Sequence, residues 1–188
     1  MTSNLTTLQI NLVRKGKTWF ETQGILLAQE LKMLTILEFV ELLRDLKDNR
    51  QEDYERITEI GYPERYEWFD TYFEKREDGM YVLTNNRTKA EKLDDDTYLE
   101  NRAVYLDSWL ENTTRQGLPN NKAKSKNDMQ DIAYSPPREN SFAWFCADSD
   151  GLYLYCTGNP NLVDIQQVRA VKIKKDAFEF INKVEAMV

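Results

Sequence analysis

The chain contains no histidine and only two cysteines, Cys146 and Cys156. Without imidazole, zinc sites with histidine ligands, Ser-His-Asp triads and Cys-His pairs are all excluded. Two cysteines are too few for a disulfide framework, so we expect two buried or semi-exposed thiols, although one hairpin register would bring them together. Most hydrolase mechanisms are thereby excluded, and we expect a protein that is not an enzyme and that uses no cofactor or metal ion.

Basic charge and long apolar runs are also scarce. The 25 lysines and arginines are outnumbered by 32 aspartates and glutamates, giving a net charge of −7. Because phosphate contacts need a basic face, we expect no nucleic-acid partner. No run of about 18 apolar residues is present, so we expect no membrane span. The first residues lack the apolar core of a signal peptide, which predicts a soluble protein that is not secreted by that route.

What the sequence does contain is enough apolar material for a core. Apolar residues make up 41% of the 188 positions and aromatic residues 12%, including 10 tyrosines and 4 tryptophans. This length fits a single domain over 1–188. Most of the aromatic residues are expected in the core, but tyrosine and tryptophan are also the side chains enriched at binding surfaces.

Local signals predict an opening strand over 8–13 and helices soon after it. Thr18 with Glu21 three residues later forms a capping box, which predicts a helix over 18–31. A second helix is expected over 32–46 with Thr35 as its N-cap, and a third, weaker one over 52–60. The apolar stripe of the second helix repeats every three residues, at Leu37, Val40, Leu43 and Leu46.

Strand signals come later in the chain. Residues 69–73 and 81–83 flank a turn and predict a hairpin, with helix as the competing interpretation of the first arm. Residues 85–140 form a polar, loop-like insert, with a short helix over 99–110 and the composition of a mobile loop over 115–131. Strands are expected over 142–147, 152–156 and 168–174, before a last helix capped by Asp176. The fold class is therefore α+β.

The segment 141–156 alternates in an unusual way. Ala143, Phe145 and Ala147 resemble one buried face, whereas the intervening side chains share no chemistry. Asp148–Gly151 matches part of a calcium loop. The matching frame places Cys146 first and Thr157 last, where calcium needs oxygen donors and a bidentate glutamate, so a tight hairpin turn is favoured.

Three short motifs carry a resemblance to a known family. Residues 32–39 (KMLTILEF) are similar to the step between the two helices of C-type lectin folds of the formylglycine-generating-enzyme kind, with Ile36 in place of a proline. Residues 18–22 (TWFET) are similar to the opening of the preceding helix, and 168–172 (VRAVK) to the closing strand. Residues 141–169 resemble the variable region of target proteins of diversity-generating retroelements, with archaeal and archaeal-virus members the most similar, although Gln166 and Gln167 replace the usual Leu-Gly.

This resemblance implies a C-type lectin fold with two early helices packed on small antiparallel sheets and a variable region over about 141–170. It implies a ligand-binding, receptor-binding protein whose hypervariable surface meets an unknown macromolecule, a protein or cell-surface component. The displayed set that it implies is Trp144, Cys146, Asp148, Asp150, Gly151, Tyr153, Tyr155, Thr157, Gly158, Asn159, Asn161, Leu162, Val163 and Asp164. The scaffold set is Ala143, Phe145, Ala147, Leu154, Cys156, Pro160, Val168 and Arg169.

Two other functions remain open on the sequence. One is an enzyme of the formylglycine-generating kind, for which only Cys146 and Cys156 would be available as reactive thiols. The other is a viral structural protein in which the final strands mediate assembly.

Overall fold

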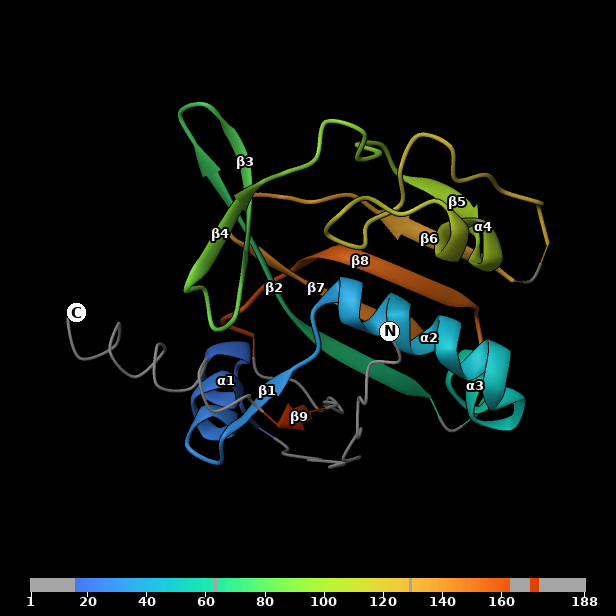
Figure 1. Cartoon of the computed structure of the whole chain (residues 1–188), viewed down its shortest axis with the longest axis horizontal. Coiled ribbons are helices and arrows are strands. Elements are labelled where there is room, and N and C mark those ends of the chain that lie inside the picture. Colours follow the sequence, from blue (N-terminus) through green and yellow to red (C-terminus); the bar gives the residue numbers. More distant parts are fainter. Residues whose placement is uncertain (1–15, 63, 129, 163–169, 173–188) are drawn as a thin grey trace.

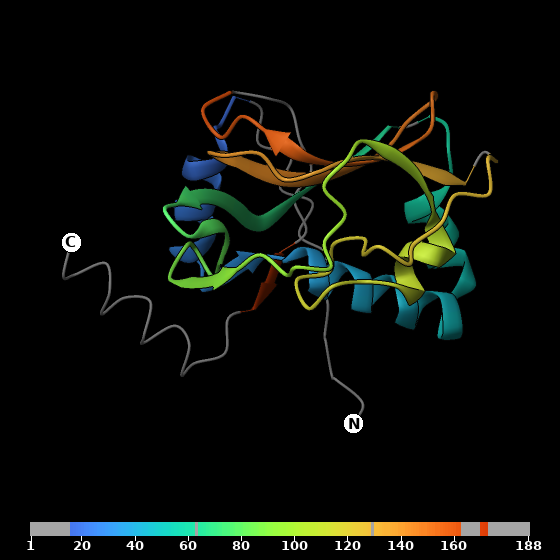
Figure 2. The ribbon, with the colours of Figure 1, turned by 90° about the horizontal axis from the view of Figure 1, so that it is seen from above.

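The computed structural model describes residues 16–62, 64–128, 130–162 and 170–172. They form an α+β fold built on a mixed seven-stranded sheet with the strand order β4-β3-β2-β7-β8-β6-β5 (Figure 1). Seen from above, the helices α2, α3 and α4 lie on one side of this sheet (Figure 2). A separate two-stranded sheet, β1 with β9, lies beside α1.

The first two helices begin directly after their predicted N-caps, although residues 32–34, expected in the second helix, precede it. Thr18 caps α1 (Trp19–Leu27) and Thr35 caps α2 (Ile36–Asn49), each with both reciprocal hydrogen bonds of the box. The third predicted helix is confirmed as α3 (Gln51–Thr58). The expected end of the first helix is wrong, because the chain turns at Glu30 with φ 56° and then forms β1 (Leu31–Met33). The stripe of α2 is confirmed except at Leu37, which is half-buried.

The predicted hairpin is confirmed, with strand rather than helix in its first arm. β2 (Arg65–Arg76) pairs antiparallel with β3 (Gly79–Thr84), and Phe73 lies opposite Val82. The two strands predicted over 142–156 are confirmed as β7 (Ser141–Ala147) and β8 (Leu152–Gly158), which pair antiparallel through the turn at Asp150 and Gly151.

The insert over 85–140 is not a loop, which corrects the sequence prediction. It supplies β4 (Lys89–Lys92), β5 (Arg102–Tyr105), α4 (Leu106–Glu111) and β6 (Asp131–Ser135). The expected helix over 99–110 is therefore half strand. The expected mobile loop over 115–131 buries Leu118 and Ala123 in the core, which ties that segment down despite its polar composition.

The sheet arrangement also differs from the small antiparallel sheets that the resemblance implies. Seven strands share one sheet, and β6 pairs with β8 in parallel. The last described strand, β9 (Ala170–Lys172), pairs with β1 and not with β8. The strand expected over 8–13 and the helix expected after Asp176 lie outside the described residues.

Two hydrophobic clusters hold the sheet. The larger one packs α2, α3 and α4 against the inner face, where Phe39, Phe69 and Phe145 meet. The smaller one packs Trp19 of α1 against the opposite side of the same strands, over Trp68 and Phe142. We call that second side the outer face: it carries Trp68, Trp144, Tyr153 and Tyr155, because side chains two residues apart on a strand share a face.

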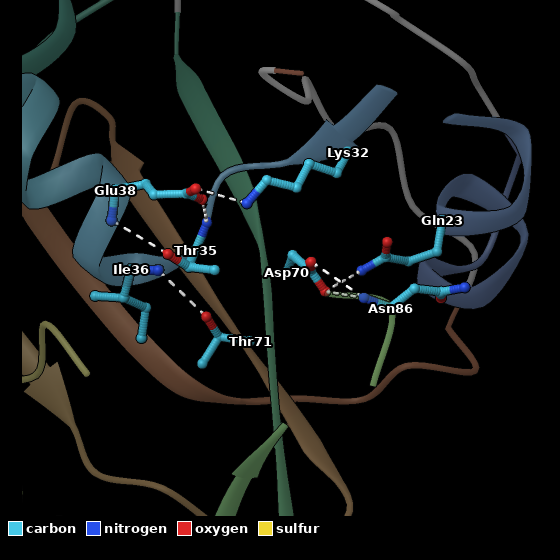
Figure 3. Close-up of polar contacts among 8 residues, drawn as sticks. All are labelled: Gln23, Lys32, Thr35, Ile36, Glu38, Asp70, Thr71 and Asn86. Atoms are coloured by element: carbon cyan, nitrogen blue, oxygen red, sulfur yellow. Dashed lines mark hydrogen bonds and ion pairs between the residues drawn. The ribbon is translucent and has the colours of Figure 1, made fainter. Parts of the chain in front are cut away.

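A bulge in β2 attaches the early helices to the sheet. The register of β2 with β7 shifts between Trp68 and Tyr72, so the backbone between them is free for other partners. The indole Nε1 of Trp19 donates to the carbonyl of Phe69 at 2.9 Å, and the amide of Asp70 donates to the carbonyl of Leu34 at 2.8 Å. The amide of Ile36 donates to the hydroxyl of Thr71 at 3.2 Å (Figure 3).

Asp70 is the centre of this attachment and is fully buried. Its carboxylate accepts from Nε2 of Gln23 at 2.9 Å and from the amide of Asn86 at 3.1 and 3.2 Å (Figure 3). Burial raises the pKa of Asp70 to about 6; the charge of Lys32 and these hydrogen bonds lower it, and the charge of Glu38 raises it further. One side chain thus links β2 to α1 and to the β3–β4 turn.

Within the described residues, no helix combines the length and apolar character needed to cross a bilayer.

Candidate ligand-binding face

Four aromatic side chains form a continuous row on the outer face, and we call them the aromatic row: Tyr66, Trp144, Tyr155 and Tyr153. The ring centroids of Tyr66 and Trp144 are 6.0 Å apart, those of Trp144 and Tyr155 are 4.6 Å apart, and those of Tyr155 and Tyr153 are 5.4 Å apart. All four side chains are half-buried. Contacting aromatic rings gain about 0.5–1.5 kcal/mol beyond area burial, so the row holds its own shape.

The alternation of β7 and β8 positions this row. Ala143, Phe145 and Ala147 on β7 are at most 1% exposed, as the inner-face prediction requires. Leu154 and Cys156 on β8 are fully buried on the same inner side. Because successive side chains on a strand point to opposite faces, Trp144, Tyr153 and Tyr155 are directed to the outer face. On β2, Tyr66 extends the aromatic row and lies opposite Cys146. Trp68 belongs to the smaller hydrophobic cluster and lies opposite Trp144.

The turn after β7 places carboxylates next to the row. Oδ1 of Asp148 accepts from the amides of Asp150 and Gly151, at 2.8 and 3.1 Å, which fixes the turn. Gly151 has a φ of 148°, a conformation that side chains with a Cβ rarely adopt. Glu64 accepts from the hydroxyl of Tyr66 at 2.6 Å, and this bond, ahead of burial, raises the pKa of that phenol.

The predicted displayed set differs in exposure from residue to residue. Trp144, Asp148, Gly151, Tyr153, Tyr155 and Thr157 are half-buried, and Asp150, Asn159, Asn161 and Leu162 are exposed. Pro160 of the scaffold set is buried, as expected. Val163 and Asp164, like Val168 and Arg169 of the scaffold set, lie outside the described residues.

Cys146 does not belong to the displayed set, which corrects the prediction. It is 1% exposed, because Tyr66 on β2 and Tyr153 on β8 are its cross-strand neighbours and cover it from both sides. Its Sγ lies 3.3 Å from Oδ2 of Asp148. Burial, followed by the hydrogen bond and charge of Asp148, raises the pKa of the thiol to about 12.

Gly158 is likewise not a free position. A Cβ on Gly158 would lie 2.7 Å from the ring of Phe142, which is only 4% exposed. The missing side chain is therefore what lets β8 approach that ring. Gly158 belongs with the scaffold set.

The two thiols do not approach each other. Cys146 faces outward and Cys156 inward, and both are free. Burial raises the pKa of Cys156 well above its ordinary value, so neither thiol is a thiolate at neutral pH. In the described ranges, no three His, Cys, Asp or Glu side chains are grouped so as to hold a metal ion.

Sequence reasoning missed Tyr66 and Glu64. Both precede the hairpin arm predicted over 69–73, and Tyr66 pairs with Cys146 of β7, which lies about 80 positions later in the sequence. The only local signal for the outward direction of Tyr66 is the alternation of side chains within 65–68.

Comparisons of the chain with protein-family models, with curated proteins and with solved structures find no match.

Proposed function

We propose that this chain is a ligand-binding protein and that the aromatic row, with the turn beside it, is its binding surface. The observation that carries this proposal is the contrast across one pair of strands. The inner side chains of β7 and β8 are buried. On the outer face, the half-buried aromatic rings of the row have no described helix over them. Tyrosine and tryptophan offer large rigid contact area at low entropic cost, and they dominate binding hot spots.

Several features support a C-type-lectin-like fold as part of this proposal. The two capped helices are joined by the connecting segment that the resemblance to residues 32–39 implies. The strand between them, β1, pairs with the late strand β9. The seven-stranded sheet, which takes in three strands of the insert, goes beyond what the resemblance implies. The proposed fold therefore rests on the connection between α1 and α2 and on the pairing of β1 with β9.

We further propose that the outer face is diversified by a retroelement. A buried side chain tolerates little change of volume, whereas surface substitutions usually change stability by about 0.5 kcal/mol or less. Exposed positions such as Asp150, Asn159 and Asn161 meet that condition, and Cys146 and Gly158 do not. The test is the DNA beside the gene: a near-identical template copy should differ at codons for exposed positions and match at those for Ala143 and Phe145.

Binding itself is tested with a random-peptide display library selected on the full chain. Trp144, Tyr153 and Tyr155 are replaced together by alanine, and Tyr81→Ala, a half-buried tyrosine of β3, is the matched control. Peptides selected on the wild type should bind the control equally and the triple variant at least about tenfold less, since hot-spot truncations exceed about 1.4 kcal/mol. Thermal unfolding of all three proteins checks that the fold persists.

Three results would overturn the proposal. Equal binding of the selected peptides to the triple variant would place the ligand elsewhere, and a library that yields no binder would leave the face without a protein ligand. A wild type that self-associates while the folded triple variant is monomeric would instead assign the face to assembly, the structural alternative; solution mass distinguishes this case.

A further inference from the structure

Three half-buried tyrosines elsewhere in this protein are each paired with a cation of the chain. The guanidinium of Arg76 lies 4.3 Å from the ring centroid of Tyr81, and that of Arg102 lies 4.1 Å from the ring of Tyr98. Lys126 places its Nζ 3.5 Å from the ring of Tyr105. A cation over an aromatic face is stabilised by the ring quadrupole, so this arrangement recurs for a physical reason.

The aromatic row differs from those tyrosines. Over residues 16–62, 64–128, 130–162 and 170–172, no lysine or arginine lies on any of its four rings. Trp144 and Tyr155 are contacted by other rings of the row on both sides, so they offer mainly ring edges. Tyr153 stands at the end of the row, stacked nearly parallel on Tyr155 at an interplanar angle of 8°. Its second face is directed along β8, away from Tyr155.

Gly151 leaves that second face of Tyr153 uncovered. Residues 151, 153 and 155 share one side of the strand, so the side chain that would cover the ring belongs to position 151. A Cβ there would lie 3.9 to 4.0 Å from the hydroxyl and ring carbons of Tyr153, in ordinary contact. The glycine thus leaves a gap against the ring where a neighbour would normally pack.

Two carboxylates without a cation flank this gap. Asp148 accepts from the amide of Gly151, Asp150 precedes that glycine, and neither forms an ion pair with any described residue. Asp150 is exposed. The pKa of Tyr153 is raised by burial first and then by the charges of Asp148 and Asp150, as expected for a ring in a negative field.

Two cations on elements of the same sheet region, Arg65 and Lys126, are engaged elsewhere. Arg65 on β2 donates to the carbonyl of Glu59 at 2.6 Å and lies near its carboxylate, and Lys126 lies over Tyr105. Tyr105 is on β5, two strands from β8, which corresponds to about 10 Å at the usual strand spacing. Among the described residues, no lysine or arginine forms an ion pair with Asp150 or lies on the ring of Tyr153, so a cation from a partner would meet both without a competitor.

We infer that the partner of the outer face is a basic protein segment, and that one of its arginines occupies the gap at Gly151, against Tyr153 and beside Asp150. This inference rests on the proposed binding function and adds the chemistry of the ligand. Arginine fits better than lysine because its planar guanidinium stacks on an aromatic face and presents paired donors to a carboxylate at the same time.

The first experiment analyses the peptides selected on the wild-type chain. Those that lose affinity for the triple aromatic variant should be enriched in arginine, and replacing their arginines by citrulline should weaken binding about tenfold. Citrulline keeps the shape and planarity of arginine and removes the charge, so the loss reports the cation–π contact and the ion pair together. If the peptides that lose affinity for the triple variant are neutral or acidic, the inference of a basic partner is wrong. The proposed binding function would not be affected by that result.

The second experiment changes the protein. Asp150→Asn removes one charge at nearly constant volume and should weaken the arginine peptides about two- to fivefold, and Tyr153→Ala should weaken them by a similar factor. The matched control is Glu41→Gln, an exposed carboxylate on α2, which covers the inner face. The citrulline peptides should not distinguish Asp150→Asn from the wild type. An equal loss for both peptide types would show that the substitution acts without the guanidinium.

A third measurement separates the ligand classes directly. The ¹⁵N-labelled full chain is titrated with acetyl-Gly-Arg-Gly-Arg-Gly-amide, with its citrulline analogue and with a neutral glucose hexamer. Only the arginine peptide should shift the amide signals of Asp150, Gly151 and Tyr153. Shifts produced by the sugar and not by the arginine peptide would overturn the inference in favour of a carbohydrate ligand.

Discussion

The two ends of the outer face carry similar side chains in different surroundings. At one end Tyr72 and Phe142 lie beneath Trp19 of α1, with ring centroids 5.8 and 5.6 Å from the indole, and all three side chains are buried. At the other end the rings of Trp144 and Tyr155 lie closer still, at 4.6 Å, yet both remain half-exposed. Contacts between rings on one sheet face therefore do not bury the rings by themselves. Burial at this face requires the helix that covers it.

The comparison assigns different roles to chemically similar side chains. Trp19 joins α1 to the bulge of β2 and is required for the second hydrophobic cluster. Trp144 touches the edge of that cluster and extends into the open row. The four predictions below probe the boundary between the covered and the open end.

The largest effect is expected from Trp19→Ala, which removes a side chain that is 0% exposed and the hydrogen bond of its indole to Phe69. We expect a loss of about 3–5 kcal/mol in the free energy of unfolding. Trp144→Ala, at the open end, should lose about 1–2 kcal/mol. Urea denaturation of both variants measures the difference, and equal losses would remove the distinction between the two ends.

A pH-dependent effect is expected from Asp70, which attaches the covered end. Its pKa is raised in the folded state, from 3.8 to about 6, so its protonated form is favoured by folding. The stabilisation is complete below pH 3.8 and is lost as the pH rises through 6. The shift corresponds to about 3 kcal/mol.

The measurement compares the wild type with Asp70→Asn, whose side chain does not titrate. The free energy of unfolding of the wild type, relative to the variant, should fall by about 3 kcal/mol between pH 3.5 and pH 7. A difference that stays constant over this range, or that grows with pH, would contradict the raised pKa. The charges of Lys32 and Glu38 act on the same carboxylate, so Lys32→Met is expected to raise the apparent pKa further.

A smaller effect is expected at the boundary of the displayed set. Gly158→Ala brings a Cβ within 2.7 Å of the ring of Phe142 and should destabilise the protein by about 1–3 kcal/mol through overpacking. Thermal unfolding measures this loss. An unchanged melting temperature would return Gly158 to the displayed set.

The smallest effect is expected from Asp150→Ser. Asp150 is exposed, and only its backbone amide is bonded within the turn. We expect a change within about 0.5 kcal/mol in the free energy of unfolding. A larger loss would show that the turn depends on this side chain, which would exclude Asp150 from the freely substitutable positions.

The sequence predicted those elements whose signals are local. Thr18 and Thr35 each fix a helix start within four residues, and the alternation of Ala143, Phe145 and Ala147 identifies the inner side of β7. The strands β4, β5 and β6 were missed because they are short. In addition, β5 and β6 acquire their strand conformation by pairing with segments that are not adjacent in the sequence, whereas β4 pairs with its neighbour β3.

The residues of the site also divide into those whose place the sequence predicted and those whose place depends on distant strands. Trp144 was predicted on the outer face from alternation, and Tyr153 and Tyr155 were expected as displayed residues from the family resemblance; all three lie on that face. The burial of Cys146 was not predictable, because Tyr66 reaches it from a strand that precedes it by 80 positions. Periodicity specifies which way a side chain points, but the neighbours on adjacent strands decide whether it is exposed.

By itself, the sequence determined the starts of the helices, the hairpins and the orderly inner side of β7 and β8, since each depends on contacts between near neighbours. Only the tertiary structure decided which end of the outer face α1 covers, that β6 joins β8 in parallel, and that Tyr153 faces a gap at Gly151. These features arise where segments far apart in the chain meet, and the free energy of such contacts is set by packing rather than by local propensity.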